Sequence, residues 1–205
     1  MKKIFIITLI IIGIILPVKS QDNSSSFLVM GVPQYLITKG LRIDFDLKTQ
    51  KPKKWVVLSP ILYLNQNSDD YLYDENIYGG GIEVTFKQFL SKEDNAKGVY
   101  FAYGPKYVYN SIEKEGEYWV ERNNLIYEET GIYTTSIHKL GINCFLGTQF
   151  DITENLFTDV YIGFGFRYSF LDYSEGEGSS YSSSWIDYGY SGILLVSGIR
   201  VGVGL

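Results

Sequence analysis

The feature that most constrains the fold is the stretch 188–205, which reads YGYSGILLVSGIRVGVGL. From Ile193 to the end, every second position is apolar except Ser197: Ile193, Leu195, Ile199, Val201, Val203 and Leu205. Toward the end, the alternate positions hold Gly198, Arg200, Gly202 and Gly204. Period-two alternation with β-branched residues is typical of a β-strand. One face is apolar and the other combines glycine with a charge, which suits a strand between lipid and the polar interior of a barrel.

Seven earlier segments show strand-like patterns of similar length. The predicted strands are residues 27–37, 41–48, 55–65, 77–90, 98–112, 132–150, 156–170 and 188–205. Their connections are short after the second, fourth and sixth strands and long after the third, fifth and seventh. An even strand count with alternating short turns and long loops is the pattern of a bacterial membrane barrel. We therefore expect an all-β fold: a single antiparallel transmembrane β-barrel of eight strands, with ten as the alternative count.

The orientation of most strands follows from their apolar positions, which we expect to face lipid. Segment 55–65 is apolar on both faces, so its orientation stays open. Aromatic residues cluster where predicted strands end, and membrane barrels carry aromatic belts at both interfaces. The predicted belt beside the long loops contains Tyr63, Tyr78, Tyr107, Tyr109, Tyr133, Tyr168 and Tyr188. The predicted belt beside the short turns contains Trp55, Phe89, Phe101, Phe150 and Phe157.

The first twenty residues have the features of a secretory signal peptide. A basic start at Lys2 and Lys3 precedes an apolar run over 4–16, and Val18 and Ser20 provide small residues before a cut at Gln21. An uncleaved anchor helix is the alternative, although the run is short for a membrane span of roughly 20 residues. The expected domains are a signal peptide over 1–20, a polar leader over 21–26 and the barrel over 27–205.

Charge and cysteine content narrow the functional classes. The formal net charge of −5 argues against nucleic acid as a partner. Cys144 is the only cysteine, so an exported chain of this sequence has no internal disulfide. Stability must then come from elsewhere, and a closed ladder of strands would supply it.

The signal peptide, the alternating segments, the LFTDVYIGFGFRYSF strand and the terminal GYSGILLVSGIRVGVGL resemble the small outer-membrane β-barrel proteins of Gram-negative envelopes. The OmpX type and the OmpA transmembrane domain are the nearest in architecture. The resemblance implies a monomer in the cell outer membrane, with membrane lipid and lipopolysaccharide as neighbours. It also implies an assembly signal for the barrel-assembly machinery at Ile199, Val201, Val203 and Leu205, where those proteins usually end in Phe.

The inward-facing parity carries many charges. The predicted interior network comprises Arg42, Asp44, Asp46, Glu83, Lys87, Lys106, Asp159, Arg167 and Arg200. An eight-stranded barrel is just wide enough to be filled by side chains, and buried charges must be paired. We therefore expect a salt-bridged polar plug. The alternative is a narrow ion path or substrate pocket, which would make the protein a porin-like channel for ions or small solutes.

The long loops are acidic and contain aromatic residues. The predicted loop 113–130 and the Ser/Gly-rich loop 171–186 contain the candidates for contact with a surface partner: Glu115, Glu117, Tyr118, Trp119, Glu121, Tyr181 and Trp185. An adhesin-like role would use them, whereas the alternative is a solvated loop. No ligand spacing resembles an EF-hand, so we expect neither a metal nor a cofactor.

Ser136 and His138 share a parity near the end of a predicted strand. Some lipid A-modifying enzymes of the outer membrane use a Ser/His pair on the barrel wall, and an acid orients the imidazole in such sites. No signature surrounds the pair in this chain, so we expect no catalytic residues. The sequence therefore predicts a non-enzymatic barrel with an envelope-structural or surface-interaction role, and the channel and the enzyme remain as alternatives.

Overall fold

The computed structural model describes residues 26–37, 40–65, 75–91, 96–123, 125–173 and 187–205. The side chains of 65, 75, 115–121, 128, 129, 133 and 173 are outside this description. The predicted signal peptide lies outside the described residues, as does the predicted leader apart from Ser26.

The elements follow one another as eight strands with one short helix after the first. They are β1 (Phe27–Gly31), α2 (Gln34–Ile37), β2 (Gly40–Lys48), β3 (Lys54–Asn65), β4 (Glu75–Phe89), β5 (Gly98–Arg122), β6 (Leu125–Asp151), β7 (Leu156–Tyr173) and β8 (Gly192–Gly204).

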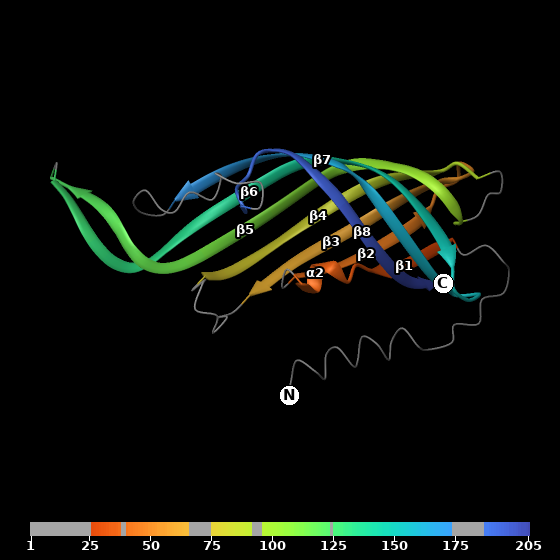
Figure 1. Ribbon diagram of the computed structural model, residues 1–205, viewed down its shortest axis with the longest axis horizontal. Coiled ribbons are helices and arrows are strands. Elements are labelled where there is room, and N and C mark those ends of the chain that lie inside the picture. The colour runs from red at the N-terminus through yellow and green to blue at the C-terminus, as the bar shows by residue number, and fades with distance from the viewer. Residues whose placement is uncertain (1–25, 38–39, 66–74, 92–95, 124, 174–186) are drawn as a thin grey trace, which may run out of the picture.

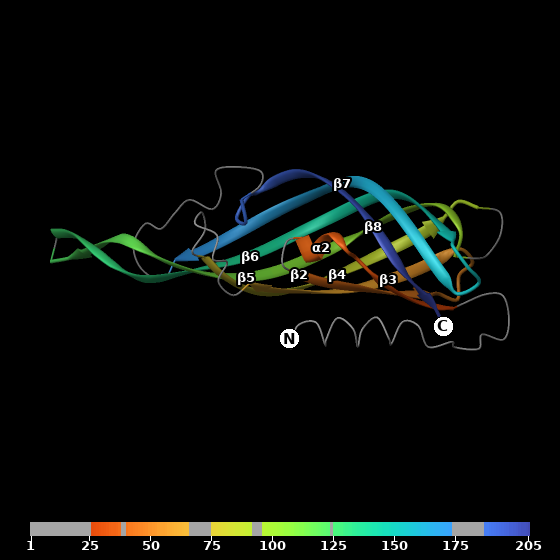
Figure 2. The same cartoon turned by 60° about the horizontal axis from the view of Figure 1, so that its bottom comes forward.

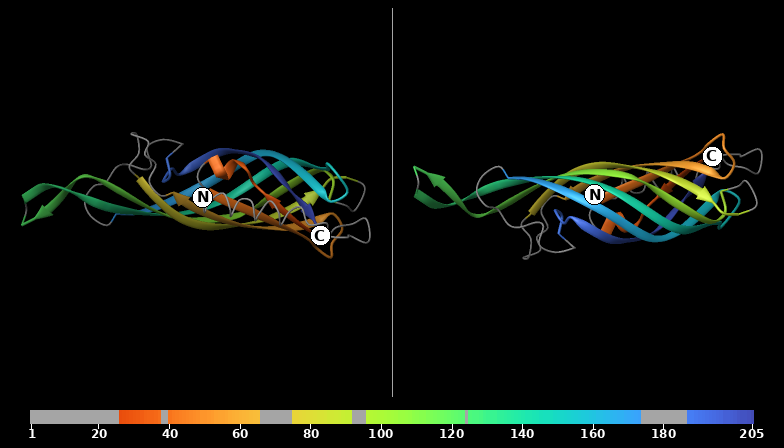
Figure 3. Two further views of the ribbon diagram at one scale, coloured as in Figure 1. Left: turned by 90° about the horizontal axis from the view of Figure 1, so that it is seen from below. Right: turned by 90° about the horizontal axis from the view of Figure 1, so that it is seen from above.

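The eight strands close into one barrel in sequence order, as Figures 1 and 3 show. Each strand is antiparallel to the next, and β1 closes the ring against β8 with Val29 opposite Val203. The amide of Leu205 donates to the carbonyl of Phe27 at 2.9 Å, just beyond this seam. The predicted eight-stranded antiparallel barrel is therefore confirmed.

The first predicted strand, 27–37, is too long. Strand β1 ends at Gly31, and Pro33 precedes the single helical turn of α2. Proline has no amide to donate to a ladder, and its constrained backbone suits the start of a helix. A turn of four residues has no sequence period by which it could be recognised. In the described part of the chain, no helix is long and apolar enough to cross a membrane.

The predicted loop 113–130 is wrong, because β5 and β6 continue through it as a β-hairpin. Arg122 pairs with Leu125 across a two-residue turn, in which Asn123 has a φ of 54°. Beyond the rungs that join Glu75 to Lys114 and Thr135 to Tyr173, neither strand has another neighbour in the described ladders. Figures 1 and 2 show this part of the hairpin running well past the ends of the other strands. We call residues 115–132 the projecting hairpin.

Both faces of strand β3 are apolar, and the two faces meet different surroundings. Trp55, Val57 and Ile61 are buried inside the barrel, whereas Leu58 and Leu62 lie on the outer surface. The orientation of segment 55–65, which the sequence left open, is thereby decided. Inside the barrel, Trp55 packs edge-on against Phe89 of β4, whereas Val57 lines a small void together with Arg42 and Lys87.

The outer surface of the barrel is apolar on every side. Exposed large hydrophobic residues on the wall include Leu58, Leu62, Ile82, Phe86, Phe101, Tyr103, Leu140, Ile142, Ile162, Phe164, Phe166, Ile193, Leu195 and Ile199. A soluble protein rarely exposes a contiguous apolar surface larger than a few hundred Å². The polarity is therefore inverted relative to a soluble barrel.

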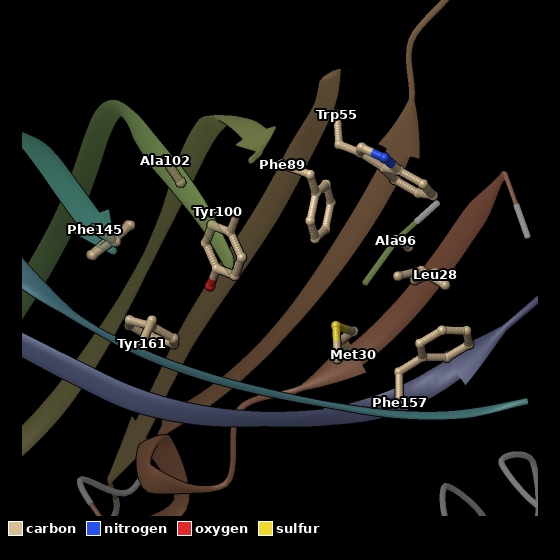
Figure 4. Packing of buried hydrophobic residues seen from close by; sticks show 10 residues of the cluster. All are labelled: Leu28, Met30, Trp55, Phe89, Ala96, Tyr100, Ala102, Phe145, Phe157 and Tyr161. Carbon is tan, nitrogen blue, oxygen red and sulfur yellow. The ribbon is translucent and has the colours of Figure 1, made fainter. Parts of the chain in front are cut away.

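One half of the interior is filled by an apolar cluster beside the short turns (Figure 4). Its members are Leu28, Met30, Trp55, Phe89, Ala96, Tyr100, Ala102, Phe145, Phe157 and Tyr161. The predicted aromatic belt at this end is thus partly wrong. Phe101 and Phe150 face outward, whereas Trp55, Phe89 and Phe157 point into the barrel, where they cover one another instead of meeting an interface.

Candidate functional site: the interior of the barrel

The middle of the barrel holds a network of buried charges contributed by β2, β4, β7 and β8. Three cations and four carboxylates take part: Arg42, Lys87, Arg200, Asp44, Asp46, Glu83 and Asp159. The four carboxylates are 0% exposed. Alternation turns every second side chain of each strand inward, so charges on one parity of four strands converge on the same interior.

Arg42 joins β2 to β4. Its guanidinium lies 2.7 Å from Asp44 and 2.8 Å from Glu83, and it also donates to the Ser59 hydroxyl at 3.1 Å. Asn143 donates from β6 to Glu83 at 2.9 Å. The Glu83 carboxylate is therefore held by donors from two other strands.

Asp159 on β7 is the second centre of the network. It accepts from Lys87 at 2.8 Å and from the Tyr100 hydroxyl at 2.6 Å, and it is also paired with Arg200. Lys87 contacts Asp46 at 3.3 Å as well. Charge-assisted bonds of this kind are about twice as strong as neutral ones.

The network bridges the lumen rather than following one wall. Arg200 on β8 reaches Asp44 on β2 at 3.1 Å, and Lys87 on β4 reaches Asp159 on β7. Together with the apolar cluster, it leaves a void of about 20 Å³ beside Arg42 and Arg200. Such a void has room for about one water molecule. At this level the described charges therefore lie against one another inside the barrel.

Two members of the predicted charge set stand outside the network. Lys106 lies 3.9 Å from Glu83, at the limit of an ion pair, and hydrogen-bonds to the Tyr35 hydroxyl at 3.2 Å. Arg167 makes no ion pair within the described residues. Both side chains line a separate cavity of about 450 Å³ on the side of the projecting hairpin.

Sequence reasoning missed the neutral partners of the network and the residues that α2 contributes. Tyr100, Gln149, Ser59 and Asn143 bond to the charges, and Gln34 donates from α2 to Tyr161 at 3.3 Å. The first four share the inward parity of their strands, which was the available indication. No indication existed for α2, because its position depends on the connection between β1 and β2.

The outer-loop candidates are only partly placed. Tyr181 and Trp185 lie outside the described residues. Residues 115, 117, 118, 119 and 121 lie on β5 in the projecting hairpin, where Trp119 pairs with Glu128 by register and the side chains are outside the description. The predicted assembly residues Ile199, Val201 and Val203 lie on β8, and Leu205 follows it.

Ser136 and His138 are each bonded to a tyrosine of β5. The Ser136 hydroxyl is 3.2 Å from that of Tyr109, and His138 Nδ1 is 2.9 Å from the Tyr107 hydroxyl. These contacts place both residues in an outward-facing aromatic patch. In the part of the chain that is described, no group of three or more His, Cys, Asp or Glu side chains could hold a metal ion.

Comparison with known proteins yields little. No protein-family model matches the chain, and no curated protein does. Among solved structures, CarO of Acinetobacter baumannii is similar, with 13% sequence identity over 90% of this chain and 100% of that chain and a TM-score of 0.44. A likeness of this degree carries no argument about function.

Proposed function

We propose that this chain is a non-enzymatic outer-membrane β-barrel that contacts a surface partner through the projecting hairpin. The interior charges serve stability in this proposal, and no solute passes through them. The signal peptide over 1–20 would direct export and leave Gln21 as the first residue of the mature chain.

The inverted polarity of the barrel supports a membrane location. Apolar residues surround the outer wall, and burying them in lipid avoids the cost of exposing them to water. A closed barrel also pairs its backbone groups internally, which is a requirement for crossing a bilayer. Strands β5 and β6 have 25 and 27 residues, far more than the roughly 9–11 that a crossing needs.

The surface role rests on one observation, the projecting hairpin. Its two strands pair with each other without a break from Glu115 opposite Ile132 to Arg122 opposite Leu125, so the extra length is a regular two-stranded ribbon. A two-stranded ribbon without further support is only marginally stable, and nothing in the barrel requires it. Its sequence combines Tyr118 and Trp119 with an excess of glutamate, and aromatic residues dominate the binding energy of protein interfaces.

Deletion of residues 117–130 tests the surface role. The deletion joins Gly116 to Gly131, which face each other in the ladder, so Glu115 and Ile132 would be linked by a two-glycine turn. We expect the shortened chain to fold, with boiling still shifting its gel mobility. We also expect cells that produce it to lose most of their aggregation with one another and their retention on protein-coated surfaces. Equal adhesion by the shortened and the full chain would contradict the surface role.

The location has a separate test. We expect the full chain in the outer-membrane fraction, with gel migration that changes on boiling and with Gln21 at its N-terminus by mass spectrometry. Recovery of the chain from the soluble periplasm, without a mobility change on boiling, would refute the membrane assignment.

A further inference from the structure

The interior of the barrel is divided into a closed half and an open half. The charge network and the apolar cluster fill the half beside the short turns. The other half holds the cavity of about 450 Å³, and Arg42 and Tyr161 line both this cavity and the small void beneath it. Sites for small molecules occupy roughly 300–1,000 Å³. The cavity is therefore a blind pocket of suitable size.

The wall of this pocket is basic. Arg42, Lys106, Lys139 and Arg167 line it from β2, β5, β6 and β7, and no aspartate or glutamate among the described residues does so. The chain as a whole has a net charge of −5, so composition does not explain the local excess of cations. Only Arg42 has its charge fully matched, by Asp44 and Glu83.

Lys139 and Arg167 are the unmatched cations. Lys139 is 8% exposed, and two neutral groups contact it: the Tyr188 ring at 5.5 Å and the side-chain amide of Asn110, whose oxygen lies 2.7 Å away when the amide is oriented toward it. No ion pair joins either cation to a described carboxylate. Burying a positive charge away from water destabilises the folded protein unless a negative charge lies beside it.

The ladder register places a further cation beside Arg167. Lys106 is opposite Gly141 on β6, and Gly141 is opposite Arg167 on β7. Both side chains line the pocket on either side of this glycine, and no described aspartate or glutamate lines it with them. Like charges around one pocket repel each other, and an anion between them would reverse the sign of that interaction.

One side of the pocket is apolar. Val108 lines it from β5, and Leu194 and Val196 line it from β8. Leu194 and Val196 come shortly after Gly192 on β8, and Gly192 is opposite Arg167 on β7. The apolar side therefore adjoins the basic wall. A bare inorganic ion would leave this surface uncovered, whereas an anion with a short hydrocarbon part would bury it.

We propose that this pocket binds a small organic carboxylate. Its anionic oxygens lie between Arg167 and Lys139, with Lys106 adding charge, and its hydrocarbon part packs against Leu194 and Val196. The guanidinium fork of arginine matches the two oxygens of a carboxylate. The proposal is independent of the surface role of the projecting hairpin, because the two use different parts of the molecule.

Calorimetry on the full chain, folded in a non-ionic detergent, tests the site. The probes are acetate, butyrate and hexanoate, with 1-hexanol as the uncharged control and inorganic phosphate as the purely polar one. We expect hexanoate to bind at least tenfold more tightly than acetate and phosphate, and 1-hexanol to show no binding beyond its uptake by detergent. Affinity that is independent of chain length, or equal for 1-hexanol, would overturn the proposal.

Matched variants locate the binding. Arg167→Gln and Lys139→Gln should each weaken hexanoate at least tenfold. Lys51→Gln removes the same charge from an exposed turn at the far end of the barrel and should leave affinity unchanged. Equal weakening by all three variants would mean a general charge effect and would refute the site.

A measurement on the unchanged protein covers the case in which a variant fails to fold. Phenylglyoxal modifies arginine side chains, and mass spectrometry reads the modification at each position. Hexanoate should slow the modification of Arg167 several-fold, and 1-hexanol should not. Equal modification of Arg167 with and without hexanoate would exclude the proposed position of the anion.

Discussion

At the scale of single residues, the interior depends on a few carboxylates that each hold several donors. Asp159 is completely buried and accepts from Lys87, Tyr100 and Arg200. In such a group, the gain from pairing offsets the cost of removing charges from water. If one partner is removed, the cost of taking the other charges out of water remains, while the gain from pairing is lost. A single substitution in the network should therefore lower the free energy of unfolding strongly.

Asp159→Asn is expected to destabilise the barrel by about 3–5 kcal/mol, because Lys87 and Arg200 both lose a counter-charge in the interior. Asp151→Asn is the control, since Asp151 pairs with Lys97 at a half-exposed position and its loss should cost below about 1 kcal/mol. Urea titration of the two folded proteins, followed by gel mobility, measures the difference. Equal midpoints for the two variants would show that the network contributes little.

At the scale of elements, the shortest ladder of the barrel is the seam between β1 and β8. It consists of four rungs, from Leu28 opposite Gly204 to Gly31 opposite Val201. At Gly202 the two backbones approach so closely that a Cβ would overlap the carbonyl of Val29 and crowd the Cα of Met30. Glycine is thus required there by the neighbouring backbone, which cannot turn aside as a side chain could.

Gly202→Ala is expected to lower the free energy of unfolding by about 1–3 kcal/mol, the usual cost of overpacking. Gly80→Ala is the matched control, because its added Cβ would meet Ile61 at 3.6 Å and Leu62 at 3.8 Å, which are ordinary contacts. Denaturation midpoints of the two alanine variants, measured side by side, check this. Equal denaturation midpoints for Gly202→Ala and Gly80→Ala would contradict the close approach of the two backbones.

The projecting hairpin differs from the barrel strands in its support. Residues 98–112 of β5 have β4 on one side and β6 on the other, whereas residues 115–122 pair with β6 alone. Amide hydrogens are protected in proportion to the cost of local opening, and a ribbon edge opens easily. Hydrogen exchange should therefore be at least tenfold faster over 115–130 than over 98–112. Uniform protection along β5 would show that something covers the hairpin.

At the scale of the whole molecule, the interior charges bear on whether the lumen can conduct. The apolar cluster and the charge network share Tyr100, and Arg42 and Tyr161 line both the small void and the larger cavity on the side of the projecting hairpin. The ion pair of Lys87 with Asp159 crosses the lumen between β4 and β7, and the void beside the network is about 20 Å³. An ion would have to break several buried ion pairs to pass.

We therefore expect no steady conductance when the full chain is reconstituted in planar lipid bilayers. Protein inserted in the same preparation should still show the gel mobility change on boiling, which confirms that folded barrels are present. A steady conductance that shifts in Asp159→Ala or Arg167→Ala would refute the closed lumen and favour the channel.

Much of this architecture was predictable because alternation is a local property of the sequence. Strands β2, β4 and β7 were placed to within a few residues, and most charged residues of their inward parity are buried. The projecting hairpin was not predicted, because glutamates made 113–130 resemble a loop. The Asn123-Asn124 pair between two runs of strand-forming residues was the overlooked indication of a two-residue turn.

By itself, the sequence determined that the chain forms a barrel of strands and, for most of them, which residues face outward, because a period of two assigns each side chain to a face. Tertiary structure alone decided which of those inward groups meet. Residues far apart in the chain, such as Asp44 and Arg200, become partners only when closure brings β8 beside β1. In the described part of the chain, the same closure brings no carboxylate to Arg167 or Lys139, since the register places these two around a cavity.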